Sequence, residues 1–375
     1  MQKDRRSRFA AENVSLPPEE TGVATTLEKM PKKQGNQYSE IDVVEWLRGL
    51  PKVELHLHLE GTILPETLLE LSKRHDAEPL TPAAAAALYQ YENFLGFMDS
   101  FKAVSSRLVG PEDYELITYN MIRDLAAQGV VHAEVYVSFG IIFYWKNAEV
   151  EPFVEAIERG RVRGEKDFGT TVYWLIDAVR HFGAEEGAKV FRKAAELRHQ
   201  YPSIVGIGIG GDEARGSADL FRESYAEAKA AGLRLTAHAG ETIGPESIWA
   251  AINIGAERVG HALSAQHDAE LMDVLAQKQI PLELNVTSNI KTGCCREFGA
   301  HPVKMYFESG LMVTINSDDP PMFGSDLLGE YVLVQDRYEF SLEQMRELAA
   351  NAVEASFLPP ERKLDLLKRV EQYGY

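Results

Sequence analysis

The sequence predicts an α/β protein built as a closed (β/α)8 barrel, a TIM barrel with a helical insertion after its first strand. Eight short apolar runs alternate with longer amphipathic stretches, and no linker rich in Pro, Gly or Ser divides the array. Most runs are continuous rather than alternating, which is typical of parallel strands covered on both faces. An open doubly wound sheet remains the alternative, because periodicity does not say whether a sheet closes.

The expected strands follow one another at regular intervals after residue 40. They are Val53–Leu59, Val130–Phe139, Thr171–Val179, Val205–Gly211, Arg234–Glu241, Arg258–Ala262, Pro281–Asn289 and Met312–Pro320. The expected helices between them include Ala218–Ala231, Glu246–Ile254 and Asp268–Lys278. The first of these helices has Ser217 as its N-cap and Gly232 just past its end.

One long insertion, Pro65 to Gly129, separates the first two strands. Within it, the apolar residues of Tyr91–Val104 recur near helical spacing. This segment is either ordinary core or a lid over the functional site.

The barrel is expected to occupy residues 41–375, and residues 1–40 a disordered N-terminal extension. The extension starts with basic residues, as a transit peptide does, but acidic residues soon follow (Glu12, Glu19 and Glu20). It lacks the apolar core of a secretory signal.

Composition narrows the class of protein. The chain has 375 residues, with 39 Lys and Arg against 57 Asp and Glu, a formal net charge of −18. Such acidity argues against a nucleic-acid partner, and no apolar run approaches the ~20 residues that span a bilayer. The only cysteines, Cys294 and Cys295, are adjacent, which argues against a disulfide framework and favours a reducing, cytoplasmic location. We expect a small-molecule substrate; the oligomeric state stays open.

Metal-capable residues collect where the expected strands end, the usual place for catalytic residues in such a barrel. His56 and His58 form an H-x-H pair, and because side chains alternate along a strand, both imidazoles share one face. Two such nitrogens suit a divalent ion such as zinc. The other clusters at strand ends are His238 with Glu241, His261 alone, and Asp318 with Asp319.

Two adjacent aspartates in a barrel mouth would repel unless a cation relieved them, so these clusters predict a metal site. Acids and bases left free beside the metal would suit hydrolysis. No G-x-S-x-G elbow or P-loop is present, and the glycines of Gly206–Gly211 fit a crowded strand better than a dinucleotide loop. The remaining histidines are not expected to be ligands: His75, His132, His181, His199, His267 and His301.

Several motifs, in order along the chain, resemble those of the adenosine and adenine deaminases of the amidohydrolase superfamily. They are Pro51–Gly61, Gly211-Asp212-Glu213, His238-Ala239-Gly240-Glu241, Arg258-Val259-Gly260-His261, Thr287-Ser288-Asn289-Ile290-Lys291-Thr292 and Ser317-Asp318-Asp319-Pro320. The resemblance covers the chain from about residue 48 to its C-terminus and implies a (β/α)8 barrel that binds one zinc ion.

The resemblance also implies a role for each matching residue. The zinc ligands would be His56, His58, His238 and Asp318. Glu241 would protonate N1 of a purine, and His261 would position and deprotonate the attacking water. Asp319 would orient the nucleophile and share a hydrogen bond with N7, and the backbone N–H of Gly211 would reach N3. Attack at C6 then releases ammonia.

Glu60 departs from the adenosine branch, which typically has Asp at this position, associated with the sugar hydroxyl; adenine-specific relatives resemble this chain here. The motifs at Gly211 and at Ser288-Asn289-x-x-Thr292 look instead like the nucleoside branch. Adenosine or 2′-deoxyadenosine is therefore the favoured substrate. The alternatives are adenine and a 5′-modified adenosine such as aminodeoxyfutalosine of menaquinone synthesis, which the longer Glu60 side chain would favour.

Two other classes of function remain to be weighed. A two-metal amide or phosphotriester hydrolase usually needs a carboxylated lysine, and the expected strands carry no lysine at their ends. A catalytically inactive binding module would be expected to lack Glu241 or a ligand, and this chain retains all of them.

Overall fold

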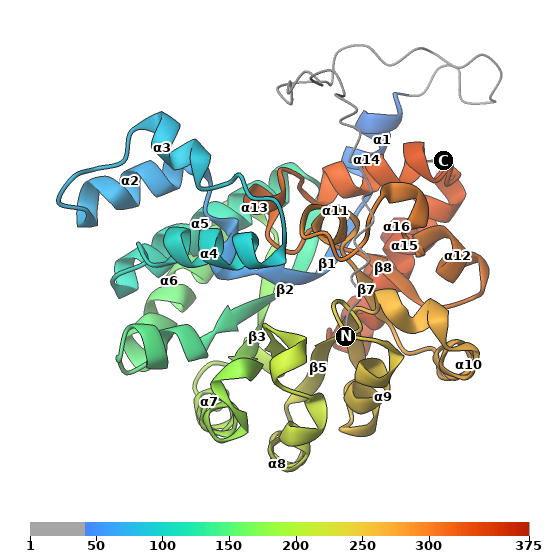
Figure 1. Cartoon of the computed structure of the whole chain (residues 1–375). Coiled ribbons are helices and arrows are strands. Elements are labelled where there is room, and N and C mark those ends of the chain that lie inside the picture. Colours follow the sequence, from blue (N-terminus) through green and yellow to red (C-terminus); the bar gives the residue numbers. More distant parts are fainter. Residues whose placement is uncertain (1–41, 375) are drawn as a thin grey trace, which may run out of the picture. The chain divides into compact units, whose positions relative to one another are not determined.

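Eight parallel strands form the centre of the molecule in the computed structural model, which describes residues 42–374 (Figure 1). The extension expected over residues 1–40 lies outside the described residues. The strands pair in the order of the sequence. They are β1 Lys52–His58, β2 Val130–Ser138, β3 Thr171–Val179, β4 Ile204–Gly210, β5 Arg234–Ala239, β6 Arg258–His261, β7 Leu282–Leu284 and β8 Val313–Ile315.

The first and last strands close the ring. Leu57 and Asp318 form a parallel bridge, in which the Asp318 N–H donates to the His56 carbonyl at 3.1 Å. The His58 N–H donates in turn to the Asp318 carbonyl at 3.0 Å. The predicted closed (β/α)8 barrel is thus confirmed, and the open-sheet alternative is excluded.

Helices surround the strands, as the parallel sheet requires. The α-helices are α1 Val43–Gly49, α2 Pro65–His75, α3 Pro82–Ala87, α4 Phe94–Ser105, α5 Pro111–Ala127, α6 Glu151–Phe168, α7 Ala184–Leu197, α8 Arg222–Ala230, α9 Pro245–Asn253, α10 Ala269–Lys278, α11 Val286–Lys291, α12 Val303–Glu308, α13 Pro320–Phe323, α14 Leu327–Arg337, α15 Leu342–Ala355 and α16 Pro360–Glu371. Short 3-10 turns occur at Leu59–Thr62, Arg180–Phe182, Glu213–Arg215, Ala218–Phe221, Leu263–His267 and Phe298–Ala300, and a π-helical turn at Ile141–Trp145. No helix among these is long and apolar enough to cross a membrane.

The last two expected strands are only three residues long in the structure, far shorter than the apolar runs that predicted them. β7 ends at Leu284 and α11 begins at Val286, so Ser288 and Asn289 lie on a helix. The run after β8 turns into the site at Asp318, whose φ of 66° is incompatible with an extended strand. A continuous apolar run shows burial, and a buried turn of helix produces the same signal as a strand.

The insertion after β1 is helical, as predicted. Helices α2 and α3 project to one side of the barrel, whereas α4 lies beside its open end (Figure 1). Phe97 of α4 is buried and packs on Phe323 with ring centroids 5.0 Å apart, while Phe94, Met98 and Phe101 line a cavity in the barrel mouth. Helix α4 therefore belongs to the core and also forms one wall of that cavity.

The interior of the barrel contains a buried ionic network below the mouth. Arg258 of β6 pairs with Glu134 of β2 and, through Nε, with Glu283 of β7 at 2.6 Å. The guanidinium also lies 4.0 Å from the centroid of the Phe357 ring, beyond the end of α15. All three charged side chains are fully buried, and the one guanidinium pairs with both carboxylates.

Candidate active site

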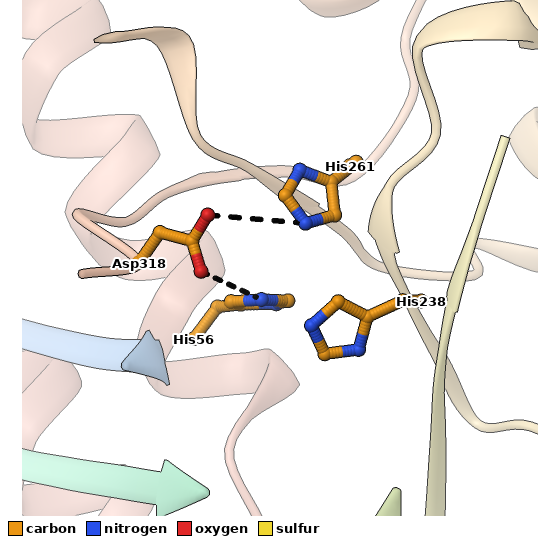
Figure 2. A group of neighbouring side chains, drawn as sticks. All are labelled: His56, His238, His261 and Asp318. Atoms are coloured by element: carbon orange, nitrogen blue, oxygen red, sulfur yellow. Dashed lines mark ion pairs between the residues drawn. The ribbon is translucent and has the colours of Figure 1, made fainter. Parts of the chain in front are cut away.

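The strand-end clusters predicted from the sequence converge at the open end of the barrel. Figure 2 shows His56, His238, His261 and Asp318 pointing toward one another. One nitrogen or oxygen from each of these four residues lies within 4.8 Å of all the others, and all four side chains are buried. The four come from β1, β5, β6 and the turn after β8, so only barrel closure brings them together.

His58 points into the same centre. Its Nε2 lies 3.1 Å from Nε2 of His238 and 3.4 Å from Oδ1 of Asp318, and Nε2 of His56 lies 3.5 Å from the same oxygen. Nε2 of His261 is farther from the carboxylate, 4.0 Å from Oδ2. Five groups thus surround one point. The set drawn in Figure 2 and the set implied by the sequence share His56, His238 and Asp318 and differ only in whether His261 or His58 is the fourth member.

The arrangement fits a divalent cation. Nε2 of His56 is buried and has no hydrogen-bond partner within the described residues. Burial lowers the pKa of His58 to about 3 and that of His238 well below its usual range, so both are neutral, as metal ligands must be. Burial opposes a charge on His56, yet the neighbouring carboxylates of Asp318 and Glu283 raise its pKa to about 10, so the site favours positive charge at its centre.

Glu283 supports this centre from below. Its Oε2 lies 2.8 Å from Nδ1 of His56, and its other oxygen accepts from Arg258. A carboxylate behind a histidine fixes the tautomer of the imidazole and leaves Nε2 free to bind a metal. Sequence analysis missed this residue, although a lone Glu between Leu282 and Leu284 in a buried strand was a signal for it.

Glu241 has the properties of a general acid. It lies just past β5 and lines the cavity, and its Oε2 is 3.8 Å from Nε2 of His261. Burial, reinforced by the charges of Asp318 and Glu213, raises its pKa to about 8. Glu241 is therefore protonated near neutral pH and able to donate a proton into the cavity.

Glu213 holds the loop that carries Glu241. Its Oε2 accepts hydrogen bonds from the backbone N–H groups of Glu241 at 3.0 Å, Thr242 at 2.8 Å and Ile243 at 3.2 Å. Its Oε1 accepts from Gly240 at 2.6 Å and from the Ser247 hydroxyl. Sequence analysis quoted Glu213 only as part of a motif, and nothing in the sequence indicated that its carboxylate binds the loop of Glu241.

A chain of hydrogen bonds orients His261. The Val303 N–H donates to Nδ1 of His301 at 3.3 Å, so the proton of His301 lies on Nε2, which donates to Oδ1 of Asn289 at 3.1 Å. The Asn289 amide then donates to Nδ1 of His261 at 2.9 Å. The proton of neutral His261 consequently lies on Nε2, facing Glu241 and Asp318. Burial lowers the pKa of His261 to about 4, so the ring is a neutral donor in this network.

Asp319 lines the cavity beside the metal-capable cluster. Its Oδ1 is buried and has no hydrogen-bond partner in the part of the chain that the structure describes. Burial, together with the charge of Asp318, raises the pKa of Asp319 well above its usual range. A Cβ at Gly61 would lie 1.7 Å from this oxygen, so only glycine fits beside it. Gly211, with φ 84°, presents its backbone to the same cavity, next to His181.

A second polar group lies at the ends of the first three strands. Oε1 of Glu60 accepts from the Ser138 N–H at 3.0 Å, and Asp177 of β3 is in register with Ser138 of β2. All three side chains are buried and line the cavity. Sequence analysis singled out Glu60 but neither Ser138 nor Asp177, because periodicity does not show which residues of a doubly covered strand face the barrel axis.

The sequence matches the adenosine deaminase family over residues 51–373. The chain belongs to this family. An aminodeoxyfutalosine deaminase from Streptomyces avermitilis is 37% identical over 335 residues, which are 88% of this chain and 93% of that protein. An adenosine deaminase from Escherichia coli O7:K1 is 34% identical over 329 residues, 86% of this chain and 98% of that protein.

Among solved structures, an adenine deaminase from Arthrobacter aurescens superposes with a TM-score of 0.81 at 28% identity, covering 86% of this chain and 98% of that one. As a member of the adenosine deaminase family, the chain is an enzyme, a hydrolase of C–N bonds that deaminates adenine- or adenosine-like substrates. The alternative of an inactive binding module is therefore excluded. These comparisons include adenine, adenosine and aminodeoxyfutalosine deaminases, so they leave the specific substrate open.

Proposed function

We propose that this enzyme uses one zinc ion to deaminate a 6-aminopurine nucleoside, and that its preferred substrate is an adenosine extended at the 5′ position, such as aminodeoxyfutalosine. Sequence analysis alone favoured unmodified adenosine. The proposal moves to the extended nucleoside because of the aminodeoxyfutalosine deaminase at 37% identity and because of the apolar lining next to Glu60.

His56, His58, His238 and Asp318 are the ligands we assign to zinc. Nε2 of His58 lies 3.1 Å from Nε2 of His238, and Oδ1 of Asp318 lies 3.4 Å from Nε2 of His58 and 3.5 Å from Nε2 of His56. By contrast, Nε2 of His261 is 4.0 Å from Asp318, and its Nδ1 accepts from Asn289. Three imidazoles and one carboxylate are a typical donor set for zinc. When bound here, zinc lowers the pKa of water, so that a nucleophile is available near neutral pH.

Side chains and backbone groups of the protein bind the purine ring and donate the proton that N1 requires. Protonated Glu241 donates to N1, which gains electron density as an oxygen atom bonds to C6. The backbone N–H of Gly211 donates to N3, and Asp319 faces N7. The Nε2–H group of neutral His261 donates a hydrogen bond to the attacking oxygen and holds it on one face of the purine ring. This role takes the place of the role as a base that the resemblance implied. The proton of the added hydroxyl group passes to N6, the C6–N6 bond breaks, and the release of ammonia leaves a 6-oxopurine.

The apolar lining carries the choice of substrate. Glu60 is hydrogen-bonded to the last residue of β2, and the π-helical turn Ile141–Trp145 begins three residues further along the chain. Ile141 and Trp145 line the cavity together with Phe94, Phe97 and Phe101 of α4. A sugar bound at Glu60 would therefore direct its 5′ group toward aromatic side chains, which favour a large apolar substituent over a hydroxyl group.

The test is a comparison of kcat/KM for aminodeoxyfutalosine, adenosine, 5′-methylthioadenosine and adenine, followed by absorbance. We expect aminodeoxyfutalosine to exceed adenosine by about tenfold or more. Trp145→Ala should reduce the efficiency with the extended substrate more than with adenosine. Trp46→Ala is the matched control, because Trp46 packs on Tyr373 with ring centroids 5.2 Å apart and does not line the cavity.

Adenosine is the second candidate, favoured by the nucleoside-type motifs at Gly211 and Ser288. A higher efficiency with adenosine than with either 5′-modified nucleoside would establish it as the substrate. A preference for free adenine would contradict the nucleoside assignment as a whole.

A further inference from the structure

Two polar side chains in the active-site cavity have no partner that explains their burial. Oδ1 of Asp177 and the hydroxyl oxygen of Ser138 are both buried without a hydrogen bond to any described residue. Asp177 is 4% exposed and Ser138 6%. A buried carboxylate or hydroxyl with no partner costs folding free energy, so these groups are expected to serve a ligand.

The surroundings of Asp177 offer no internal substitute for that ligand. Arg180, whose positive charge acts on Asp177, donates instead to the backbone carbonyls of Gly216 and His238. The inward positions of the neighbouring strand β4 are glycines, and even a methyl group at Gly210 would come within 3.3 Å of Oδ2 of Asp177. The space in front of the carboxylate is therefore kept free of side chains.

The position of this carboxylate relative to the purine identifies the part of the substrate that it meets. Asp177 lies beside Gly210, and the next residue, Gly211, is the one assigned to N3. On the other side, Gly61 packs against Asp319, which is assigned to N7, and Glu60 directly precedes Gly61. In a purine, N9 and its sugar lie on the side between N3 and N7, away from N1. Glu60, Ser138 and Asp177 consequently surround the place of the sugar.

We propose that Asp177 and Ser138 form, together with Glu60, a subsite for the ribose hydroxyl groups, in which Asp177 accepts a hydrogen bond from one of them. This inference rests on the proposed nucleoside substrate and adds two residues that determine specificity for the sugar. The ligand chemistry is that of sugar hydroxyl groups: carboxyl oxygens of Asp177 and Glu60 accept hydrogen bonds, and the Ser138 hydroxyl both donates and accepts.

The experiment measures kcat/KM of the wild type, Asp177→Asn, Asp177→Ala and Ser138→Ala with adenosine, 2′-deoxyadenosine, 3′-deoxyadenosine and adenine. We expect Asp177→Ala to reduce the efficiency with adenosine by about 10- to 100-fold, mainly through KM. The loss should be much smaller for the deoxynucleoside that lacks the bound hydroxyl, and absent for adenine. The affinity for the products, inosine against hypoxanthine, should show the same selectivity by calorimetry.

Asp113→Asn is the matched control. Asp113 is a buried carboxylate that accepts from the Val109 and Gly110 N–H groups, and it does not line the cavity. Its replacement should leave the ratios among the four substrates unchanged. Asp177→Asn keeps the shape of the side chain, so it reports on the subsite even if the alanine variant fails to fold.

Equal losses for nucleosides and adenine, or unchanged ratios between adenosine and its deoxy analogues, would overturn the subsite while the proposed function stands. A wild-type enzyme that deaminates adenine but no nucleoside would overturn both. The two failures are distinguishable, because the second appears in the wild type and the first only in the variants.

Discussion

The carboxylate of Glu213 accepts a hydrogen bond from the backbone N–H of Glu241, with Oε2 and N 3.0 Å apart. The buried carboxylate of Glu213 thus holds the backbone of the loop that carries the second buried acid, Glu241. Because Glu213 also accepts from three further backbone N–H groups of the same loop, it sets the position of the proposed proton donor without touching substrate itself.

Glu213→Gln should therefore lower kcat by about 10- to 100-fold, because the new amide places N–H groups against backbone donors and displaces Glu241. Zinc content should remain one per chain. Glu241→Gln is the reference: it should also keep zinc but lose about 10²- to 10⁴-fold in rate. Near-normal turnover of Glu241→Gln would remove its role as the acid, and zinc loss in Glu213→Gln would assign that residue to the metal centre instead.

Metal analysis of single alanine variants distinguishes the two possible ligand sets. His56→Ala and His58→Ala should be purified with substoichiometric zinc, because each removes one of the four proposed ligands. His261→Ala should retain zinc yet turn over slowly. Full zinc in His58→Ala combined with loss in His261→Ala would instead select the set drawn in Figure 2.

Asn289→Asp should reverse the tautomer of His261. The carboxylate accepts where the amide donated, so the ring proton moves to Nδ1 and Nε2 no longer faces the cavity as a donor. We expect kcat to fall by about tenfold or more with zinc retained. Nitrogen chemical shifts of His261 report the tautomer directly; a wild-type spectrum with the proton on Nδ1 would contradict the hydrogen-bond chain from Val303.

Glu60→Asp should change the choice among substrates. The shorter side chain withdraws the carboxylate from the Ser138 N–H and from the aromatic lining. We expect the ratio of kcat/KM for adenosine to that for aminodeoxyfutalosine to rise. An unchanged ratio would show that this position does not select.

Lys52 provides a pH-dependent test of the barrel itself. Its ammonium is buried and donates to the carbonyls of Leu47 and Leu50, and burial lowers its pKa to about 7 from 10.5. Between these values the unfolded chain binds more protons, so the free energy of unfolding rises with pH, by at most ~1.4 kcal/mol per pH unit. Relative to Lys52→Met, the free energy of unfolding of the wild type, measured by urea titration, should rise from pH 7 to pH 9. If this free energy changed with pH equally in both proteins, the lowered pKa of Lys52 would be contradicted.

The sequence predicted the barrel because strands covered on both faces are continuous apolar runs, and β3, Thr171–Val179, was predicted to the residue. It also predicted which histidines and acids gather at the open end of the barrel, because the carboxyl ends of parallel strands lie at the same edge of a sheet. Periodicity does not show which side of a doubly covered strand faces the barrel axis, and for this reason Asp177 and Glu283 were missed. Likewise His301, expected to be incidental, orients His261 through a helix that was taken for a strand.

Barrel closure between Leu57 and Asp318 has a consequence for biosynthesis. His56 and His58, two of the proposed metal ligands, leave the ribosome early, whereas Asp318, the proposed carboxylate ligand, is made only when most of the polypeptide has emerged. A nascent or prematurely terminated chain therefore lacks part of the proposed metal site, and we expect activity only after β1 has paired with the segment that follows β8.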